Sequence, residues 1–434
     1  MPHDIVAVSL PAGADPARIF AAIEPRHPEV FWLDSGTNAR EGFSYVGVGD
    51  AVPAEVVHDV ALGGSADGGD SGWSVPGRFR GGWIGWFSYE SGAHGMGAPA
   101  AGPADDRWMR VRRWVAFEHA TGRAWAVAPA SDAPEWHARM TDAAASPAPE
   151  PLPPTGSTEA RARHTAEHYA VMIERCRDAI REGDAYQLCL TTRFEAPAAD
   201  AATVYARLRA GSPAHHGAFV RIGDTALLSA SPEEFLAVGD GIVRTRPIKG
   251  TRPRAADAAA DAALAGDLIA SEKERAENVM IVDLMRNDLA RVCEPGTVRV
   301  DALLAVESYP HVHQLVSTVS GRLRPGVRMR DLLRCAFPAG SMTGAPKLSA
   351  MGILHRLEGA PRGVYAGCFG WIGDDGGADL AMVIRSIVLR GETAVVGAGG
   401  GITWSSVTAD EVREVGIKAS APLRALGARL PSGW

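Results

Sequence analysis

The chain has 434 residues, of which 46% are hydrophobic and 22% charged, and its formal net charge is -7. No apolar run reaches the roughly 18 to 20 residues that a membrane-spanning helix needs, and no basic stripe carries interleaved aromatic residues, so we expect a globular protein with no membrane and no nucleic-acid partner. The five cysteines are far apart without a CxxC pair, and the N-terminus lacks a secretory signal pattern, which together predict a cytoplasmic protein with reduced thiols.

A proline-rich stretch marks the one predicted division of the chain. Residues 141–160 carry prolines among small and polar residues, a composition typical of an extended connector that neither helix nor strand tolerates. We therefore predict an N-terminal subdomain at residues 1–140 and a larger domain at 161–434.

The N-terminal subdomain shows the two-residue alternation of strands. Residues 79–90 and 107–119 each present an aromatic face, and the stretch at 62–72 is rich in Gly, Asp and Ser. The first two segments are predicted to be strands and the third a loop.

The larger domain begins with a helical pattern. Apolar residues recur at helical spacing from residue 169 to 180, and Gly183 supplies the stop. Residues 185–194 then alternate, which places Gln187 and Cys189 on the face opposite to the leucines. A helix followed by a half-buried strand is predicted.

The C-terminal part of the chain combines apolar runs with tight turns. Residues 363–401 contain the turns DDGG and RGET, and residues 379–389 are expected to form one strand between them. This pattern predicts a meander of antiparallel strands. The fold class is therefore expected to be α+β, built on antiparallel sheet.

Two predicted helices begin with the same polar pattern. Residues 271–274 and 408–411 both fit the S/T-x-x-E capping box. Glu277 and Glu414 lie three residues farther, on the same face as the capping glutamates and without a capping role. A carboxylate from each of two helices is a typical arrangement for holding Mg²⁺. The alternatives are exposed glutamates or, for Glu414, an ion pair with Lys418.

Lysine is rare in this arginine-rich chain. It occurs only at Lys249, Lys273, Lys347 and Lys418. An ammonium group can lose its proton and act as a nucleophile, whereas a guanidinium group cannot. Each lysine is therefore a candidate catalytic or binding residue, and the alternative is that the lysine is present at that position by chance. Lys347 follows Pro346 at a predicted helix start, where backbone N–H groups could face a carboxylate or simply be capped.

Long segments of the sequence resemble the chorismate-utilising enzymes. They include GGWIGWFSYE, TRPIKGTRPR, KERAENVMIVDLMRNDLARVC, AFPAGSMTGAPKLSAM and AGGGI, and the resemblance covers nearly the whole chain. It is strongest to the branch that makes 4-amino-4-deoxychorismate, which is related to anthranilate synthase component I. The resemblance implies large antiparallel β-sheets packed face to face, with helices on the outside.

The resemblance assigns roles to several acidic and basic residues. Glu277 and Glu414 match the family's Mg²⁺ ligands, and the ion would bridge to the ring carboxylate of chorismate. Glu233 matches the general acid that protonates the departing C4 hydroxyl, a role that needs a carboxyl group kept partly protonated by its surroundings. Tyr365 and Arg385 match positions that hold the substrate's carboxylates, and Arg385 suits a bidentate contact.

The remaining residues predicted to bind substrate come from five segments. They are Gly399 and Gly400 through their backbone, Lys418, Thr251, Ser341 and Gln187. In isochorismate-forming and salicylate-forming relatives, the position of Gln187 is a general-base lysine that activates water. Glutamine cannot take that proton, so the resemblance disfavours those products.

Lys249 distinguishes two further branches of the family. Anthranilate synthases usually read P-I-A-G-T where this chain reads P-I-K-G-T, with Lys249 in the place of alanine. The resemblance implies that the neutral amine of Lys249 adds at C2 of chorismate and is later expelled by ammonia entering at C4. A structural salt bridge is the alternative.

The expected activity requires a source of ammonia. No cysteine sits in a nucleophile-elbow context and the chain ends at Trp434 without a second domain, so a separate glutamine amidotransferase subunit is expected as the partner in a heterodimer. The alternative functions are anthranilate synthase component I and a non-catalytic sensor of aromatic metabolites. Asp34 and Ser35 resemble part of the tryptophan pocket of relatives, with a merely structural role as the alternative.

Overall fold

The computed structural model describes residues 5–37, 39–63, 75–147, 153, 157–309 and 311–434. Most of the predicted loop at 62–72 lies outside these residues. The helices are α1 (Pro16–Ile23), α2 (Ala54–His58), α3 (Tyr89–Gly95), α4 (Ala133–Ala145), α5 (Ala166–Arg181), α6 (Ala201–Gly211), α7 (Ala258–Ala270), α8 (Glu272–Ala290), α9 (Met329–Ala336), α10 (Lys347–Glu358) and α11 (Thr408–Ala425), with the 3-10 turns η1 (Glu24–Arg26) and η2 (Gly340–Met342). Among the described residues, no helix is long and apolar enough to span a bilayer.

The strands run through both predicted parts of the chain. They are β1 (Ile5–Ser9), β2 (Val30–Asp34), β3 (Phe43–Val52), β4 (Gly82–Phe87), β5 (Arg107–Glu118), β6 (Arg123–Pro129), β7 (Thr158–Glu159), β8 (Arg161–Ala162), β9 (Gln187–Pro197), β10 (His216–Ile222), β11 (Thr225–Ser231), β12 (Glu234–Gly239), β13 (Ile242–Thr245), β14 (Ile248–Pro253), β15 (Arg299–Ser308), β16 (Val312–Arg322), β17 (Gly344–Ala345), β18 (Cys368–Gly373), β19 (Ala378–Met382), β20 (Ser386–Arg390), β21 (Thr393–Ile402) and β22 (Ala428–Arg429).

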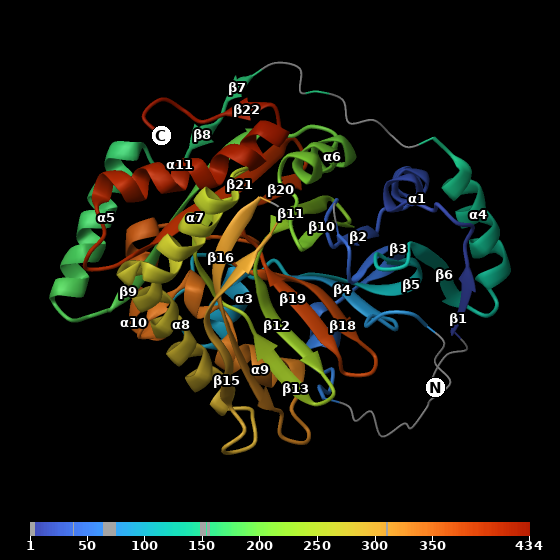
Figure 1. Ribbon diagram of the computed structural model, residues 1–434, viewed down its shortest axis with the longest axis horizontal. Helices are drawn as coiled ribbons and strands as arrows, with labels where there is room; N and C mark the ends of the chain where they lie inside the picture. The colour runs from blue at the N-terminus through green and yellow to red at the C-terminus, as the bar shows by residue number, and fades with distance from the viewer. Residues whose placement is uncertain (1–4, 38, 64–74, 148–152, 154–156, 310) are drawn as a thin grey trace.

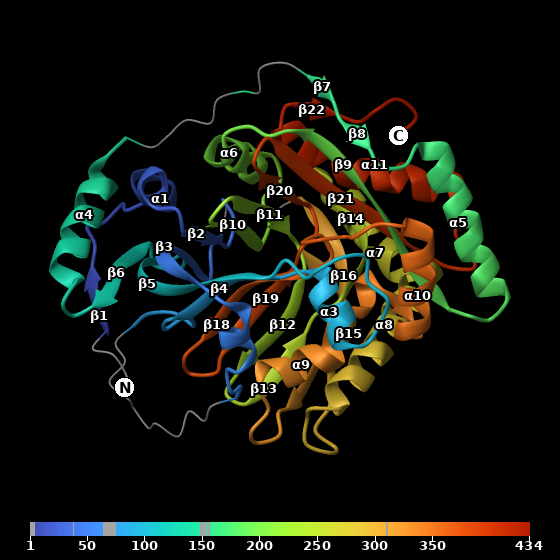
Figure 2. The same cartoon turned by 180° about the vertical axis from the view of Figure 1, so that it is seen from behind.

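The strands lie at the centre of the molecule and the helices surround them (Figures 1 and 2). Twenty strands form one hydrogen-bonded network, whereas β7 and β22 form a separate parallel pair. Strands β9 and β21 pair antiparallel over ten residue pairs, as do β3 and β5 with one shift in register. The predicted α+β fold built on antiparallel sheet is confirmed.

The core consists of a helix-facing layer and a layer between strands. Val396 and Ala398 of β21 belong to the same apolar cluster as Val415 and Ala419 of α11. A second cluster draws almost entirely on strands, including Trp86 of β4 and residues of β10 and β18. The inner faces of the strands therefore pack against each other, and helices cover the outside.

Strands of residues 1–140 are hydrogen-bonded directly to strands of the larger domain. Asp34 of β2 lies opposite Gly217 of β10, and Phe87 of β4 lies opposite Cys368 of β18. The N-terminal part therefore extends the sheet network of the larger domain.

The predicted connector begins later than its composition indicated. Helix α4 continues to Ala145, so the expectation that no helix enters residues 141–160 was wrong for its first residues. Residues 141–145 contain no proline and three alanines, the residue with the strongest helix propensity, and the first proline follows at Pro147.

The predicted strand at 379–389 is interrupted. Strand β19 ends at Met382 and β20 begins at Ser386, and Arg385 between them has a left-handed backbone with φ = 53°. Strand β19 pairs with β12 and β18, whereas β20 pairs with β11 and β21. The break therefore moves the chain from one part of the sheet to another. The other predicted elements of this domain, α5 and β9, are confirmed.

Candidate active site

One cavity brings most of the predicted site residues together. It has a volume of ≈ 510 Å³ and opens between α8, α11, β14 and the glycine-rich end of β21. Its walls include Glu233, Lys249, Thr251, Glu277, Ser341, Tyr365, Arg385, Gly399, Gly400, Glu414 and Lys418. Gln187, Asp34 and Ser35 do not line it.

Lys249 reaches the cavity from an irregularity in β14. The register between β14 and β16 shifts between Ile248 and Thr251, and Gly250 has φ = 83°. A side chain at Gly250 would also be too close to Leu268, since its Cβ would lie 2.7 Å from that side chain. Lys249 forms no hydrogen bond or ion pair with the described part of the chain, so the structure contains no salt bridge for this amine.

Glu233 lies at the turn between β11 and β12. It is 7% exposed, and burial raises the pKa of its carboxyl group to about 7, although the nearby Lys249 ammonium lowers it. Ser341 Oγ donates a hydrogen bond to Glu233 Oε1 at 3.2 Å. A carboxyl group with this pKa is partly protonated near neutral pH and is suited to donate a proton.

Glu277 and Glu414 face the cavity from α8 and α11. Burial raises the pKa of Glu277, and its buried Oε1 has no hydrogen-bond partner within the described ranges. Burial would also raise the pKa of Glu414, but nearby lysines, chiefly Lys418, lower it overall. Lys418 Nζ lies 2.7 Å from Glu414 Oε1, so the ion pair considered in the sequence analysis is present.

The donor set fits a hard divalent cation. Two carboxylates from separate helices face one hollow, and one of them carries a buried oxygen that accepts from no described group. Mg²⁺ binds oxygen ligands and shares its coordination sphere with an anionic substrate. Glu277 and Glu414 are therefore suited to hold Mg²⁺.

Lys273 and Glu411 also line the cavity, which the sequence analysis did not predict. Lys273 Nζ donates to Glu411 Oε1 at 3.2 Å, and Ser406 Oγ donates to the same oxygen at 2.7 Å. The signal was available for Lys273, because it precedes Glu277 by four residues and so lies on the same helix face.

The two predicted capping boxes differ in the structure. Ser271 caps α8, since its Oγ accepts from the backbone of Glu274 at 3.4 Å. The assignment at α11 was wrong, because Val407 is the N-cap and the Thr408 hydroxyl donates to Glu174. Helix α11 begins at Thr408, one residue earlier than the motif requires, and Glu411 lines the cavity.

Arg385 and Tyr365 form another part of the wall. The left-handed backbone of Arg385 costs conformational energy for a residue with a side chain, and such strain is typical of functional positions. Its guanidinium group faces the cavity and forms no ion pair with the described residues. The ring of Tyr365 lies against Gly397, where an added Cβ would be 2.1 Å from Cγ.

A buried ion pair holds the loop that carries Tyr365. Arg362 Nη2 lies 2.7 Å from Glu358 Oε1 at the end of α10, and both side chains are at most 4% exposed. Arg362 also donates to the carbonyl oxygens of Met342 and Cys189. This support was not predicted, because Arg362 carries no motif that separates it from the other arginines of the chain.

The remaining predicted site residues have distinct positions. Lys418 Nζ donates to the carbonyl oxygen of Gly399 at 2.9 Å, and Thr251 is exposed near the opening of the cavity. Gln187 is fully buried behind Gly401, and neither its Oε1 nor its Nε2 has a hydrogen-bond partner in the described structure.

Lys347 has a structural role. Its Nζ lies 2.6 Å from Asp288 Oδ2 and donates to the carbonyl oxygens of Cys335 and Ala336. Lys347 is the first residue of α10, as predicted, but its side chain is buried and does not line the cavity. Its ammonium group thus links the start of α10 to Asp288 of α8.

Asp34 and Ser35 lie in the N-terminal part, away from the cavity. Arg209 Nε donates to Asp34 Oδ2 at 2.5 Å, and the guanidinium group stacks on Trp32. The Ser35 hydroxyl donates to the carbonyl oxygen of Phe43 at 2.8 Å. These polar groups are thus partnered by the protein itself.

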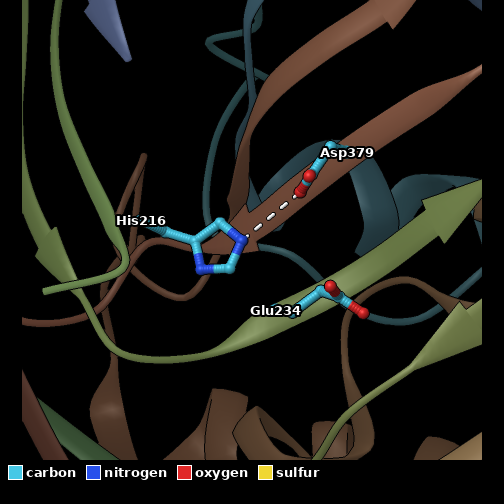
Figure 3. Close-up of side chains that lie close together, drawn as sticks. All are labelled: His216, Glu234 and Asp379. Carbon is cyan, nitrogen blue, oxygen red and sulfur yellow. Dashed lines mark ion pairs between the residues drawn. The ribbon is translucent and has the colours of Figure 1, made fainter. Parts of the chain in front are cut away.

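A second group of ionisable side chains lies outside the cavity (Figure 3). His216, Glu234 and Asp379 offer ligand atoms within 4.8 Å of one another. His216 Nε2 lies 3.4 Å from Asp379 Oδ1, and Arg244 donates to both carboxylate oxygens of Glu234, at 2.9 and 2.7 Å. Burial opposes both charges of the first pair, yet the pairing raises the pKa of His216 and lowers that of Asp379. These contacts identify an ion-pair network.

The sequence matches a family model and the sequences of known enzymes. Residues 52–424 match the family model described as chorismate binding enzyme. The chain is 44% identical to the aminodeoxychorismate synthase of Streptomyces pristinaespiralis over 81% of this chain and 52% of that protein. It is 38% identical to aminodeoxychorismate synthase component 1 of Klebsiella aerogenes over 80% and 78% of the respective lengths. The chain spans about half the length of the first of these relatives.

A solved structure shares the fold. The chain superimposes on anthranilate synthase component I from Streptococcus pneumoniae with a TM-score of 0.74, covering 97% of this chain and 93% of that one at 30% identity. The similarity extends over both the N-terminal part and the part that contains the cavity.

Proposed function

We propose, from the premise that the chain belongs to the chorismate binding enzymes, that it converts chorismate and ammonia into 4-amino-4-deoxychorismate. The product would serve p-aminobenzoate and folate biosynthesis. The names of two relatives to which the chain is similar, both aminodeoxychorismate synthases, support this choice.

The observation that carries the proposal is the position of Lys249. Its amine stands in the cavity without a described partner, beside the buried carboxyl group of Glu233. A lysine that served only stability would be expected to have an anionic partner, as Lys347 has in Asp288. An unpaired amine next to a partly protonated carboxyl group is suited to addition coupled to departure of a hydroxyl group.

The proposed reaction proceeds by two substitutions. The neutral amine of Lys249 forms a bond to C2 of chorismate, the two ring double bonds shift, and the C4–O bond breaks as Glu233 protonates the departing oxygen to give water. Ammonia then bonds to C4, the double bonds shift back, and the C2–N bond to Lys249 breaks. The secondary ammonium formed by the addition of Lys249 returns a proton to the Glu233 carboxylate, and the ammonium formed at C4 gives a proton to the departing lysine nitrogen. The net change is chorismate plus ammonia to aminodeoxychorismate plus water.

The substrate's carboxylates would be held by the remaining wall of the cavity. We assign Arg385 and Tyr365 to a carboxylate contact, because both face the cavity and neither side chain has a polar partner in the described part of the chain. Glu277 and Glu414 would hold Mg²⁺, which would neutralise the ring carboxylate and fix its orientation.

Ammonia would come from a glutamine amidotransferase subunit in a heterodimer. The words "component 1" in the name of the Klebsiella relative support the existence of a second component in that system. We further propose a cytoplasmic location. The thiols of all five cysteines are free and buried, which is consistent with a reducing compartment.

The test uses the purified chain with chorismate, MgCl₂ and ammonium chloride, and identifies the product by mass spectrometry. Aminodeoxychorismate is expected. Anthranilate would instead identify an anthranilate synthase component I, the activity named for the structural neighbour. Absence of turnover with ammonium chloride, repeated with an added amidotransferase, would favour a non-catalytic sensor.

A further inference from the structure

An ion pair joins the two helices that carry the proposed Mg²⁺ ligands. Lys273 of α8 lies four residues before Glu277. Glu411 of α11 lies three residues before Glu414. Residues at these spacings are neighbours on one helix face, with Cβ atoms roughly 5 to 6 Å apart. Lys273 Nζ donates to Glu411 Oε1 at 3.2 Å, so the pair spans the two helices beside both proposed ligands.

The two members of this pair differ in how they are held. Glu411 is 3% exposed, and Ser406 Oγ donates to its Oε1 at 2.7 Å. Its Oε2 lies against the backbone of Gly400, where an added Cβ would be 3.2 Å away. The side chain of Lys273 lines the same cavity but is 43% exposed. The carboxylate is therefore fixed by the protein, whereas the ammonium group has access to water and can move away from it.

Helix geometry alone does not favour a lysine at position 273. Lys273 lies in the first turn of α8, where the helix macrodipole favours anions, and the same turn carries Glu272 and Glu274. Burial lowers the pKa of Lys273, but the charges of Glu411 and Glu277 outweigh this effect and raise the pKa overall. The acidic groups that line the cavity thus stabilise the ammonium form.

The charge of Lys273 acts on both proposed ligands. Burial raises the pKa of Glu277, whereas the ammonium groups of Lys249 and Lys273 lower it. Burial also opposes the charge of Glu414, but Lys418 and then Lys273 lower its pKa. A positive charge that attracts both carboxylates repels any cation that they bind.

This attraction does not occupy the ligand atoms of Glu277. Among the described residues, Lys273 donates to Glu411 alone, and Glu277 Oε1 is buried without a hydrogen-bond partner. The ammonium group therefore compensates the acidic cluster while it leaves that oxygen free of a donor. Because a buried carboxylate without a counter-charge is costly, this compensation stabilises the cation-free site and lowers its affinity for a cation.

We propose that Lys273 is the internal counter-ion of the cation site formed by Glu277 and Glu414, and that its charge weakens the binding of Mg²⁺ to the substrate-free protein. The inference rests on the proposed function, because that proposal assigns Mg²⁺ to the two glutamates. No step of the proposed reaction uses Lys273, so the inference adds a role for this residue. The alternative is that its pair with Glu411 holds the two helices together and strengthens Mg²⁺ binding.

The experiment measures Mg²⁺ binding directly. MgCl₂ is titrated into the full chain without chorismate, at low ionic strength and fixed pH, and the heat is recorded for the wild type, Lys273→Met and Lys273→Arg. Arg413→Met is the charge-matched control, because Arg413 is on α11, its side chain is 68% exposed and it does not line the cavity. Glu277→Gln shows whether the heat comes from the proposed site. Thermal unfolding checks that each variant is folded.

The sign of the change in affinity decides between the two roles. Lys273→Met should bind Mg²⁺ at least about fivefold more tightly than the wild type, whereas Lys273→Arg and Arg413→Met should stay within about twofold of it. The gain should shrink when KCl raises the ionic strength, because salt screens an exposed charge. Unchanged affinity of folded Lys273→Met would overturn the inference. Weaker binding would overturn it too, and would identify the pair with Glu411 as a link that holds the helices.

The inference and the proposed function fail in distinguishable ways. Absence of Mg²⁺ binding to both the wild type and Lys273→Met would overturn the assignment of the cation site and the inference with it. Binding that Glu277→Gln leaves intact would have the same consequence. Anthranilate as the product in the mass-spectrometric assay would overturn the proposed product but leave the effect of Lys273 on Mg²⁺ binding in place.

Discussion

The active-site cavity and the group of His216, Glu234 and Asp379 both collect ionisable side chains at strand and helix ends. In the latter group, Glu234 is held by both arms of Arg244 and Asp379 faces His216. In the cavity, Lys249 has no described partner and an oxygen of Glu277 accepts from no described group. The protein thus neutralises the first set of charges internally, whereas the cavity, despite its pairs Lys418–Glu414 and Lys273–Glu411, keeps some charged groups available to a ligand.

This comparison separates two uses of the same residue types. A buried charge without a partner costs folding free energy, so a chain retains such groups where a substrate or cation supplies the partner. Substitutions in the cavity should therefore reduce activity with little loss of stability. Substitutions of internally paired groups should reduce stability with little loss of activity.

The largest effect is expected for Lys249→Met. The variant should lose at least about 10³-fold in kcat, because methionine fills similar space without a nucleophilic amine. Its melting temperature should equal or exceed that of the wild type, since no described contact is broken. Steady-state rates and thermal unfolding measure the two quantities. A variant with full activity would exclude the covalent route, and a strongly destabilised one would contradict the comparison.

Glu233→Gln should lower kcat by about 10²-fold, as expected for loss of a general acid. In the wild type, burial raises the pKa of Glu233 to about 7, so the acid form and the rate should decline as the pH rises through 7. The residual rate of the variant should lack this decline. A wild-type profile that rose through this range would contradict the assignment of Glu233 as the acid.

The same pKa shift predicts how stability depends on pH. Because the folded-state pKa of Glu233 is raised above its ordinary value of 4.5, the folded state binds more protons and its stability falls as the pH rises from 4.5 to about 7. Glu233→Gln should therefore increase the melting temperature relative to the wild type more at pH 8 than at pH 5. Thermal unfolding at the two pH values measures the difference.

Lys347→Met tests whether substitution of an internally paired lysine reduces stability and leaves activity unchanged. Removal of the ammonium group leaves Asp288 buried without its partner, which should cost about 3 kcal/mol in the free energy of unfolding. Activity per folded molecule should stay within about twofold of the wild type, because Lys347 does not line the cavity. Denaturant unfolding measures the loss of stability, and rates normalised to the amount of folded protein measure the activity of Lys347→Met and Lys249→Met. Equal losses of activity in the two variants would contradict the distinction between structural and cavity lysines.

The sequence predicted the site better than it predicted the connections between strands. The spacing of Glu277 and Glu414 placed both on helix faces that meet in the cavity, because helical periodicity is local. The break between β19 and β20 was missed, since residues 379–389 are a nearly continuous apolar run and the left-handed backbone of Arg385 is imposed by the surrounding sheet. That break is what places the guanidinium group in the cavity.

The lysines also show that local sequence patterns do not reveal tertiary contacts. Motif context identified Lys249, but no local pattern distinguished Lys347, whose partner Asp288 is contributed by a helix 59 residues away in the sequence. Lys273 was predicted only as one of four candidate lysines, without a partner, yet it reaches Glu411 of α11 across the cavity. Tertiary contacts decide which charges are paired, and this pairing distinguishes the amine of Lys347 from that of Lys249, for which we propose a catalytic role.

Arg244→Met should have the smallest effect among these variants. It removes both donors to Glu234, whose side chain is 7% exposed, but Arg244 itself is 39% exposed, so water can replace part of the lost interaction. We expect a loss of about 1 to 2 kcal/mol in the free energy of unfolding, less than for the fully buried pair of Lys347. A double variant with Glu234→Gln should recover part of this loss, because the unpaired charge is then gone. Addition of MgCl₂ should not stabilise Arg244→Met more than it stabilises the wild type. A larger stabilisation of the variant would mean that Glu234 and Asp379 bind cations when Arg244 is absent. The distinction between the two regions would then depend on Arg244 alone.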